Sequence, residues 1–252
     1  MLGKVRTILD AFTQERPRLR LAEIRQATGI PSSTCLRLVQ NLVQEGFLAR
    51  VGDEYRIGTG MLRWLPVALA AIDVVALAQP ILDRLREQTQ ELACLFVAEG
   101  DARVCIALAQ SRQGTVRRLS IGESLPLHAG SAGKILLAYD EALFARVVRG
   151  DLQRYTENTV TDPEPLRAEV GAARRDGWAM SLNESYSGAG SLSVPSFDFD
   201  GRIAAVVCLA APAERFGEAV AREWLPYVEQ AAGELTRIIG GRAPRRPPEA
   251  EL

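Results

Sequence analysis

The sequence contains few residues that bind metals or form disulfides. It has a single histidine, His128, and only four cysteines in 252 residues. The cysteines form no C-x-x-C pair, and each lies in an apolar run: Cys35, Cys94, Cys105 and Cys208. Because cysteine and histidine at these spacings cannot complete a zinc site, we expect neither a metal nor another cofactor. The cysteines are expected to be small core residues in a reducing compartment.

Long hydrophobic runs are also missing. The richest apolar stretch, residues 64–82, is interrupted by Pro66, Asp73 and Pro80, so it is too broken to span a membrane. The first twelve residues are too short and too polar for a signal peptide. We therefore expect a cytoplasmic protein.

The whole chain has no excess of charge of one sign, but its N-terminal and C-terminal parts differ in net charge. The chain has 30 basic and 31 acidic side chains. Residues 1–60 carry nine basic and six acidic groups, a net charge of +3, which leaves −4 for the remainder. This asymmetry indicates that the N-terminal segment meets an anion.

The segment from residue 21 to residue 57 has the pattern of a winged helix-turn-helix. A short helix is expected over 21–28 and ends at Gly29. Pro31 and Ser32 begin a second helix, which ends at Gly46. Two strands, 47–51 and 55–57, then pair across a Gly-Asp turn. This order is typical of proteins that place the second helix in the major groove of DNA.

The second helix of this segment has two unlike sides. The side expected to be buried consists of Cys35, Leu36, Leu38, Val39, Leu42 and Val43. The other side carries hydroxyl, amide and arginine groups, and no carboxylate occurs between residues 32 and 44. The predicted DNA contacts are Ser32, Ser33, Thr34, Arg37, Gln40 and Asn41 on this helix, and Arg50, Tyr55 and Arg56 on the hairpin. The alternative is a helix N-terminus followed by an ordinary solvated face.

After residue 60 the pattern changes to a larger α+β region. A linking or dimer-forming helix is expected over 61–79, and Pro80 is expected to begin a further helix. Strands are expected at 92–98, 103–110, 115–119, 178–182, 190–197 and 203–210, and helices at 131–139, 141–148, 163–176 and 216–239. The alternation of these elements predicts an antiparallel α+β domain over 80–240. Residues 241–252, rich in proline and arginine, are expected to be a disordered tail.

Three stretches, in this order, resemble one protein family. They are VRTILDAF with LAEI and ATGIPSSTCLRLVQNLVQEGFL, then LPLHAGSAGKILLAY, then GWAMSLNESYSGAGSLSVPSFDFDGRIAAVVCLAAP. Over nearly its whole length the chain resembles the IclR family of bacterial transcriptional regulators. The resemblance implies a winged helix-turn-helix at 1–60, a linker helix, and a GAF-like effector-binding α/β domain with an antiparallel sheet. It also implies a homodimer or a dimer of dimers.

Residues 128–134, HAGSAGK, form the best candidate for a ligand site. Backbone N–H groups at the start of a helix bind anions. By the resemblance, the turn at Gly130 holds an effector carboxylate through the N–H groups of Ser131 and Ala132. Asn183, Ser191 and Cys208 are the further predicted effector contacts, and the resemblance places Cys208 on a strand of the pocket. Glu184 is a candidate next to them, and Cys94 and Cys105 lie on neighbouring strands. The alternative is that the small residues of this turn only allow tight packing between helix and sheet.

The expected effector is a small carboxylate with an apolar body. Cys208 and Ala210 stand where the best-known members of the family carry serines, so the pocket is less polar than theirs. An aromatic or branched-chain carboxylate is therefore expected.

An enzyme is not predicted. Ser131 and Lys134 match the S-x-x-K motif of penicillin-recognising hydrolases, but its companion motifs S-D-N and K-T-G are absent from the sequence. The turn also lacks the spacing of a nucleotide-binding P-loop.

The sequence predicts a transcriptional regulator that binds a pseudo-palindromic DNA operator and responds to a small carboxylate. Two alternatives remain open. One is a ligand-sensing interaction protein without a DNA role, and the other is a constitutive regulator with a vestigial pocket.

Overall fold

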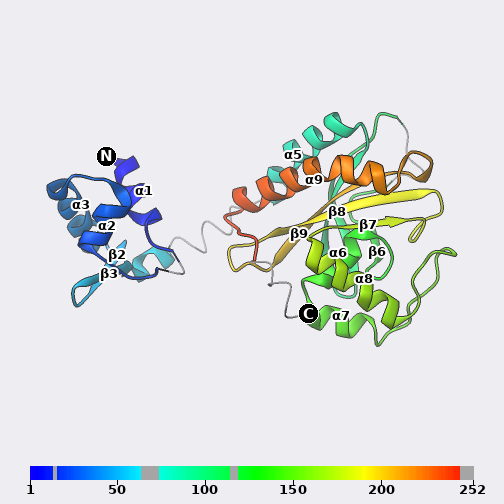
Figure 1. The fold of residues 1–252 in the computed structure, drawn as a ribbon, viewed down its shortest axis with the longest axis horizontal. Coiled ribbons are helices and arrows are strands. Elements are labelled where there is room, and N and C mark those ends of the chain that lie inside the picture. The colour runs from blue at the N-terminus through cyan, green and yellow to red at the C-terminus, as the bar shows by residue number, and fades with distance from the viewer. Residues whose placement is uncertain (14–15, 64–73, 114–118, 245–252) are drawn as a thin grey trace. The chain divides into compact units, whose positions relative to one another are not determined.

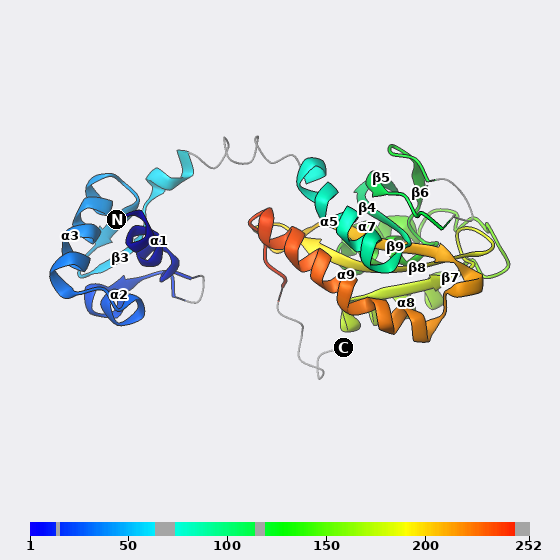
Figure 2. The same ribbon diagram turned by 90° about the horizontal axis from the view of Figure 1, so that it is seen from above.

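The structure is a computed structural model that describes residues 1–13, 16–63, 74–113 and 119–244. Its contacts divide the chain into two compact units, Met1–Ile72 and Asp73–Leu252. Figures 1 and 2 show the two units in two orientations. The described part of the expected linker helix begins with a 3-10 turn, Thr59–Arg63. Most of that linker, the strand expected at 115–119 and the end of the tail lie outside the described residues.

The first unit is a small helical domain with a three-stranded antiparallel sheet. Three helices precede a hairpin. The last two and the hairpin follow the sequence prediction, and the strand β1 was not predicted. The elements are α1 Leu2–Asp10, β1 Leu19–Arg20, α2 Leu21–Thr28, α3 Ser32–Gln44, β2 Leu48–Val51 and β3 Glu54–Ile57. One apolar core joins all of them, and Ile8, Ile24, Cys35 and Val39 are fully buried in it.

The two ends of α2 are fixed by a hydrogen bond at its start and by a glycine at its end. The Arg20 amide at the start of α2 donates to the Glu23 carboxylate at 2.7 Å, so Glu23 satisfies an N–H that the helix itself leaves open. Gly29 ends α2 with φ +66°, a conformation that side chains other than glycine rarely adopt. Glu23 thus fixes where α2 begins, and Gly29 fixes where the chain turns toward α3.

One residue of α3 lies on the side opposite to the one predicted. Leu36 was expected in the buried side of the helix, but 39% of it is exposed. The fully buried residues of α3 are Cys35, Leu38, Val39 and Leu42, and Val43 is half-buried against the same core. This narrower stripe suffices because α3 packs on one side only, against α2 and β2.

The second unit is built on a six-stranded antiparallel sheet with the strand order β6-β5-β4-β9-β8-β7. The helices α5 and α9 pack on one face, and α6 packs on the other together with α7 and α8 (Figure 1). The elements are α5 Val74–Thr89, β4 Leu92–Glu99, β5 Ala102–Ala109, β6 Ser124–Pro126, α6 Ser131–Ala138, α7 Glu141–Val147, α8 Pro163–Asp176, β7 Ala179–Leu182, β8 Ala189–Phe197, β9 Ile203–Pro212, a 3-10 turn Ala213–Arg215, and α9 Glu218–Ile238.

The boundaries of most elements agree with the sequence prediction within about two residues, and Pro80 is the clear exception. It lies inside α5, which begins at Val74, so the prediction that Pro80 begins a helix was wrong. Proline normally disfavours the turn that precedes it. Burial of Ala78, Ile81, Leu82 and Leu85 against the sheet and α9 holds the helix on both sides of Pro80.

Two searches of the described residues gave negative results. No helix there is both long enough and apolar enough to cross a bilayer. No group of three or more histidine, cysteine, aspartate or glutamate side chains is placed there to hold a metal ion.

Close packing at the start of α6 leads to a first prediction. A Cβ atom added at Gly133 would lie 2.0 Å from the Leu127 carbonyl oxygen, which is backbone and cannot move aside easily. We therefore expect Gly133→Ala to lower the free energy of unfolding of this unit by about 2 kcal/mol or more, measured by thermal or urea unfolding. Gly233→Ala in α9 is the control, because a Cβ added there would have no neighbouring described atom within 4 Å. Alanine also has the higher helix propensity. Equal stability of the two variants would contradict the packing argument.

Candidate functional site

The exposed side of α3 carries most of the predicted DNA contacts. Ser32, Ser33, Arg37, Gln40 and Asn41 are exposed, and Thr34 is half-buried. The residue before the helix is Pro31, which provides no side-chain cap for the first N–H groups of α3. Leu36 adds one apolar side chain to this side, one turn after Ser33 and one turn before Gln40. The result is a polar face without carboxylates around a single leucine.

The hairpin places two of its three predicted residues at the surface. Arg50 and Arg56 are exposed, and the Arg50 Nε donates to the Gly52 carbonyl at 2.9 Å. Tyr55 is the exception, because it is 8% exposed and belongs to the apolar core of the unit. The Arg50 guanidinium lies 6.0 Å from the centre of the Tyr55 ring. The sequence interpretation of Tyr55 as an exposed contact is therefore corrected: it is a core residue that supports Arg50.

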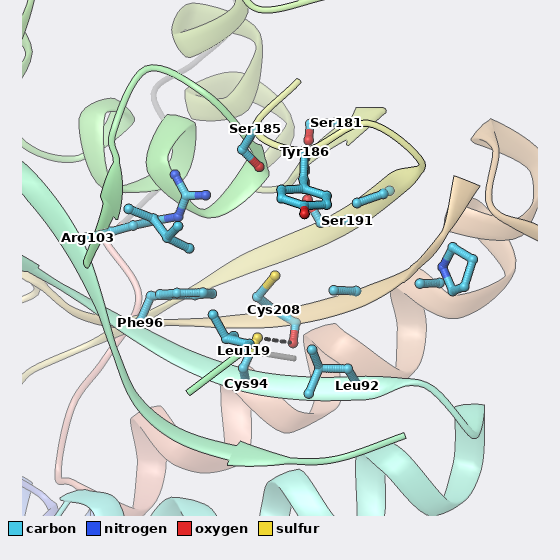
Figure 3. Close-up of a pocket in the computed structure, with 16 residues that line it drawn as sticks. Leu92, Cys94, Phe96, Arg103, Leu119, Ser181, Ser185, Tyr186, Ser191 and Cys208 are labelled. Carbon is cyan, nitrogen blue, oxygen red and sulfur yellow. Dashed lines mark hydrogen bonds between the residues drawn. The ribbon is translucent and has the colours of Figure 1, made fainter. Parts of the chain in front are cut away.

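The second unit contains a cavity on the α6 side of its sheet, shown in Figure 3. One end of the cavity is polar, with Arg103, Ser181, Ser185, Tyr186 and Ser191. The remainder is apolar or carries thiols, and it is lined by Leu92, Cys94, Phe96, Leu119, Leu125, Ala189, Gly190, Cys208, Ala210, Ala211 and Pro212. The cavity therefore suits a molecule with a charged or polar head and an apolar body.

Only two of the six predicted effector residues line this cavity. Ser191 and Cys208 form part of its wall. Ser131 is fully buried behind the wall, and its hydroxyl lies 2.7 Å from those of Ser191 and Ser193. Ser191 is in turn 3.3 Å from the Ser181 hydroxyl. Ser131 thus reaches the cavity through a chain of hydroxyl groups.

The other three predicted residues have structural positions outside the cavity wall. Ala132 is 2% exposed and packs in the apolar core. Asn183 has φ +56°, and its side-chain oxygen accepts the Gly188 amide at 2.7 Å, so it shapes the turn between β7 and β8. The Gly130 amide donates to the Glu184 carboxylate at 3.1 Å. These three positions do not form the contact surface that the sequence interpretation assigned to them.

A buried ion cluster explains why the start of α6 is not an open anion site. The Lys134 ammonium is 3% exposed and lies 2.6 Å from Glu184 and 2.5 Å from Glu169. Since Glu184 also accepts the Gly130 amide, a carboxylate of the protein itself occupies this helix terminus. Lys134 is therefore directed at two carboxylates, as a structural cation would be.

Arg103 lines the cavity, and the sequence analysis did not name it. It lies on β5, is 4% exposed, and lines the polar end of the cavity. Its Nη1 donates to the carbonyl oxygens of Pro126 and Ala129, and its guanidinium lies 5.4 Å from the centre of the Phe96 ring. A Cβ added at Gly130 would lie 2.9 Å from Nη2, so glycine leaves room for the guanidinium. The signal available in the sequence was the strand alternation, which places Arg103 on the same side of β5 as buried Cys105.

Comparison with known proteins places these two units in one family. The family model for the IclR helix-turn-helix domain matches residues 2–52. The model for the C-terminal domain of the bacterial transcriptional regulator IclR matches residues 67–237. The chain is 30% identical to the Pca regulon regulatory protein of Pseudomonas putida over 95% of this chain and 84% of that protein. It is 28% identical to the transcriptional repressor IclR of Escherichia coli, over 93% and 88% of the two chains.

Solved structures agree with this assignment. A regulator of this family from Silicibacter sp. TM1040 has a TM-score of 0.90 at 28% identity, over 98% of both chains. An IclR homolog from Microbacterium hydrocarbonoxydans, complexed with 4-hydroxybenzoate, has a TM-score of 0.60 at 25% identity, over 94% of this chain and 98% of that one. The chain therefore belongs to the IclR family and is a DNA-binding transcriptional regulator.

Proposed function

We propose that α3 and the β2–β3 hairpin read an operator, and that an organic anion in the cavity of the second unit changes this binding. The observation that carries the second half is Arg103, a buried cation at the polar end of a largely apolar cavity. A buried charge is costly, so a site that keeps one inside a cavity is suited to bind the opposite charge there.

The DNA half of the proposal assigns different tasks to the two elements. Ser32, Ser33 and Thr34 at the start of α3 would bind a phosphate, and Arg37 would donate to guanine, with Gln40 and Asn41 as further contacts. The exposed Leu36 would contact a thymine methyl group between them. Arg50 and Arg56 would contact flanking phosphates. A homodimer, or a dimer of dimers, would place two such helices on a pseudo-palindrome with half-sites about 34 Å apart.

The effector half follows from the layout of the cavity. A carboxylate beside Arg103 and Ser185 would have its apolar body toward Leu92, Ala210 and Pro212. Small side chains at 208 and 210 favour a flat or branched body, such as an aromatic or branched-chain carboxylate. The aromatic carboxylate in the structure of the Microbacterium homolog supports this chemical class.

A route for the signal begins at the bonds of Arg103 itself. Its guanidinium holds the carbonyls of Pro126 and Ala129, which flank the loop that begins α6. A bound carboxylate would draw the guanidinium into the cavity and change how this loop is held. Such a ligand shifts the protein only by its differential affinity for the two arrangements, typically about 1–3 kcal/mol. Because DNA-binding proteins of this kind act on the chromosome, we also propose a cytoplasmic location.

The recognition role of Arg37 is tested by comparison with another arginine of the same unit. Arg37→Ala should lower the preference for the operator over random DNA by about 10-fold to 100-fold, since a guanine contact is worth about 1–3 kcal/mol. Arg25→Ala is the control, because Arg25 is exposed on α2 and its loss changes the charge equally. Competition gel shifts with operator and scrambled DNA measure the difference. An unchanged preference in Arg37→Ala would remove this residue from base recognition.

The phosphate contact at the start of α3 is tested by adding a negative charge there. Ser33→Glu should abolish DNA binding, because the new carboxylate would face a phosphate. Thr7→Glu makes the same charge change on α1, where Thr7 is exposed, and should bind nearly as well as the unchanged protein. The unchanged protein should also lose affinity steeply as salt rises, in fluorescence anisotropy titrations on random DNA. Retained binding in Ser33→Glu, or a flat salt dependence, would favour the alternative of a protein-interaction module.

The role of Arg103 is tested with a charged ligand and its neutral counterpart. We expect 4-hydroxybenzoate or a related carboxylate to raise the melting temperature, and the corresponding amide to have little effect. Arg103→Met should abolish this shift, whereas Arg103→Lys should keep part of it because it retains the charge. Circular dichroism of each variant first establishes that it folds. An equal shift from acid and amide, or a full shift in folded Arg103→Met, would contradict the proposal.

A further inference from the structure

Two cysteines face each other across adjacent strands in the floor of the cavity. Cys94 on β4 is the direct antiparallel partner of Cys208 on β9. Directly opposed residues in an antiparallel pair have Cα atoms about 4.5 or 5.5 Å apart, and their side chains lie on the same side of the sheet. Both separations lie within the range that a disulfide spans, about 4.4–6.8 Å. The backbone therefore permits a bond between these thiols without moving either strand.

Both thiols are reduced, buried and part of the cavity wall. Figure 3 shows the Cys208 sulfur directed upward into the cavity, while the Cys94 thiol donates to the Cys208 carbonyl at 3.6 Å. Ser193 on β8 is the strand partner of Cys208 on its other side. A small molecule in the cavity thus meets Cys208, with Cys94 immediately next to it.

The surroundings make the two thiols chemically unequal. A hydrogen bond from Cys94, others from the Ser193 and Ser131 hydroxyls, and the charge of Arg103 hold the pKa of Cys208 below its ordinary value, against the effect of burial. The hydrogen bond to Cys208 and burial raise the pKa of Cys94 well above its ordinary value. Cys208 therefore ionises to the thiolate more readily than Cys94, which keeps its proton. This suits Cys208 to attack an oxidant and Cys94 to react afterwards as the resolving cysteine.

We propose that Cys94 and Cys208 form an oxidisable dithiol site that takes hydroperoxides from the cavity and closes to a disulfide. The Cys208 thiolate attacks one peroxide oxygen, so that an S–O bond forms and the O–O bond breaks. The leaving alkoxide or hydroxide takes up the proton that the Cys208 thiol released on ionising, and departs as an alcohol or water. Cys94 then attacks the sulfenic acid at Cys208: the S–S bond forms, the S–O bond breaks, and the hydroxide leaves as water with the proton of Cys94. One hydroperoxide is reduced and two thiols are oxidised.

The other two cysteines are built-in controls. Cys105 belongs to the same buried cluster, but its strand partner is Phe96, and burial raises its pKa to about 12. Cys35 lies in the core of the first unit, and burial raises its pKa as well. We therefore expect oxidation to link Cys94 with Cys208 and to leave Cys105 and Cys35 as free thiols.

The closed disulfide would change the cavity that the effector uses. The Cys208 sulfur would turn toward β4 and leave the wall, while the Cys94 thiol would lose its bond to the Cys208 carbonyl. Oxidation would thus act on the same sheet face as an effector without needing one to be present.

The test counts thiols in the intact, full-length protein. The folded protein is treated with hydrogen peroxide, unfolded in maleimide and analysed by mass spectrometry with peptide mapping. We expect two maleimides in place of four, a mass two hydrogens lower before labelling, and a linked pair of peptides containing Cys94 and Cys208. Dithiothreitol should restore all four thiols. In Cys94→Ser, dimedone should label Cys208 as a sulfenic acid, whereas Cys105→Ser should still form the bond.

Each contrary result is decisive because the measurement needs neither DNA nor effector. Four maleimides after peroxide, a bond that includes Cys105, or a bond between two copies of the chain would overturn the proposal. Operator titrations then test its consequence. A reversible change in affinity on oxidation that persists in Cys105→Ser and vanishes in Cys94→Ser supports the site, and the same change in Cys94→Ser overturns it.

Discussion

A buried carboxylate, Glu184, holds together the segments that surround the polar end of the cavity. Its side chain accepts the Gly130 amide and the Lys134 ammonium, so it fixes the start of α6. Its backbone carbonyl accepts the hydroxyls of Thr156 and Thr159 from the loop before α8. Loss of one partner from such a buried ion pair costs far more than the pair contributes when intact, because the remaining charge cannot be solvated. The Glu184–Lys134 ion pair therefore helps to fix the shape of the cavity without itself lining it.

This ion pair also decides where an effector charge can be neutralised. A helix N-terminus is a ready site for an anion, and the sequence interpretation placed the effector carboxylate there. In the folded chain Glu184 already occupies that position. The cavity wall carries a positive charge on Arg103 of β5. Arg103 is bonded to the same loop that Glu184 holds, so in the proposed complex the effector charge and the loop would compete for one guanidinium.

How much could be predicted from the sequence depends on whether the signal was local. The helix starts and ends of the first unit were predicted because Gly29, Pro31 and the Gly52-Asp53 turn act on their immediate neighbours. Tyr55 and Leu36 were misplaced because burial at the margin of a helix or a short strand depends on what packs there, not on periodicity. Pro80 was misread because tertiary burial of α5 outweighs the local preference of proline.

The candidate site divides in the same way. The segment 128–134 was recognised as important, and it does carry the close contacts at Gly130 and Gly133. Of its partners, Glu184 was named, but as a neighbour of the effector pocket. Arg103 and Ser193 were not named, because they lie on other strands and meet the segment only after the sheet has formed. A single arginine in an otherwise apolar strand is also a weak signal, although its position in the alternation of β5 pointed inward.

The central strand β9 contributes residues both to the proposed effector site and to the proposed dithiol site. It lies between β4 and β8, and its residues 208 and 210 are small side chains on the cavity side. Small residues there leave space, so under the proposed function β9 would set the size of a ligand and Arg103 on β5 would set its charge. The same choice of a small residue puts a thiol opposite Cys94. Selectivity for an apolar body and sensitivity to oxidation would thus have one physical origin, the residue that fills position 208.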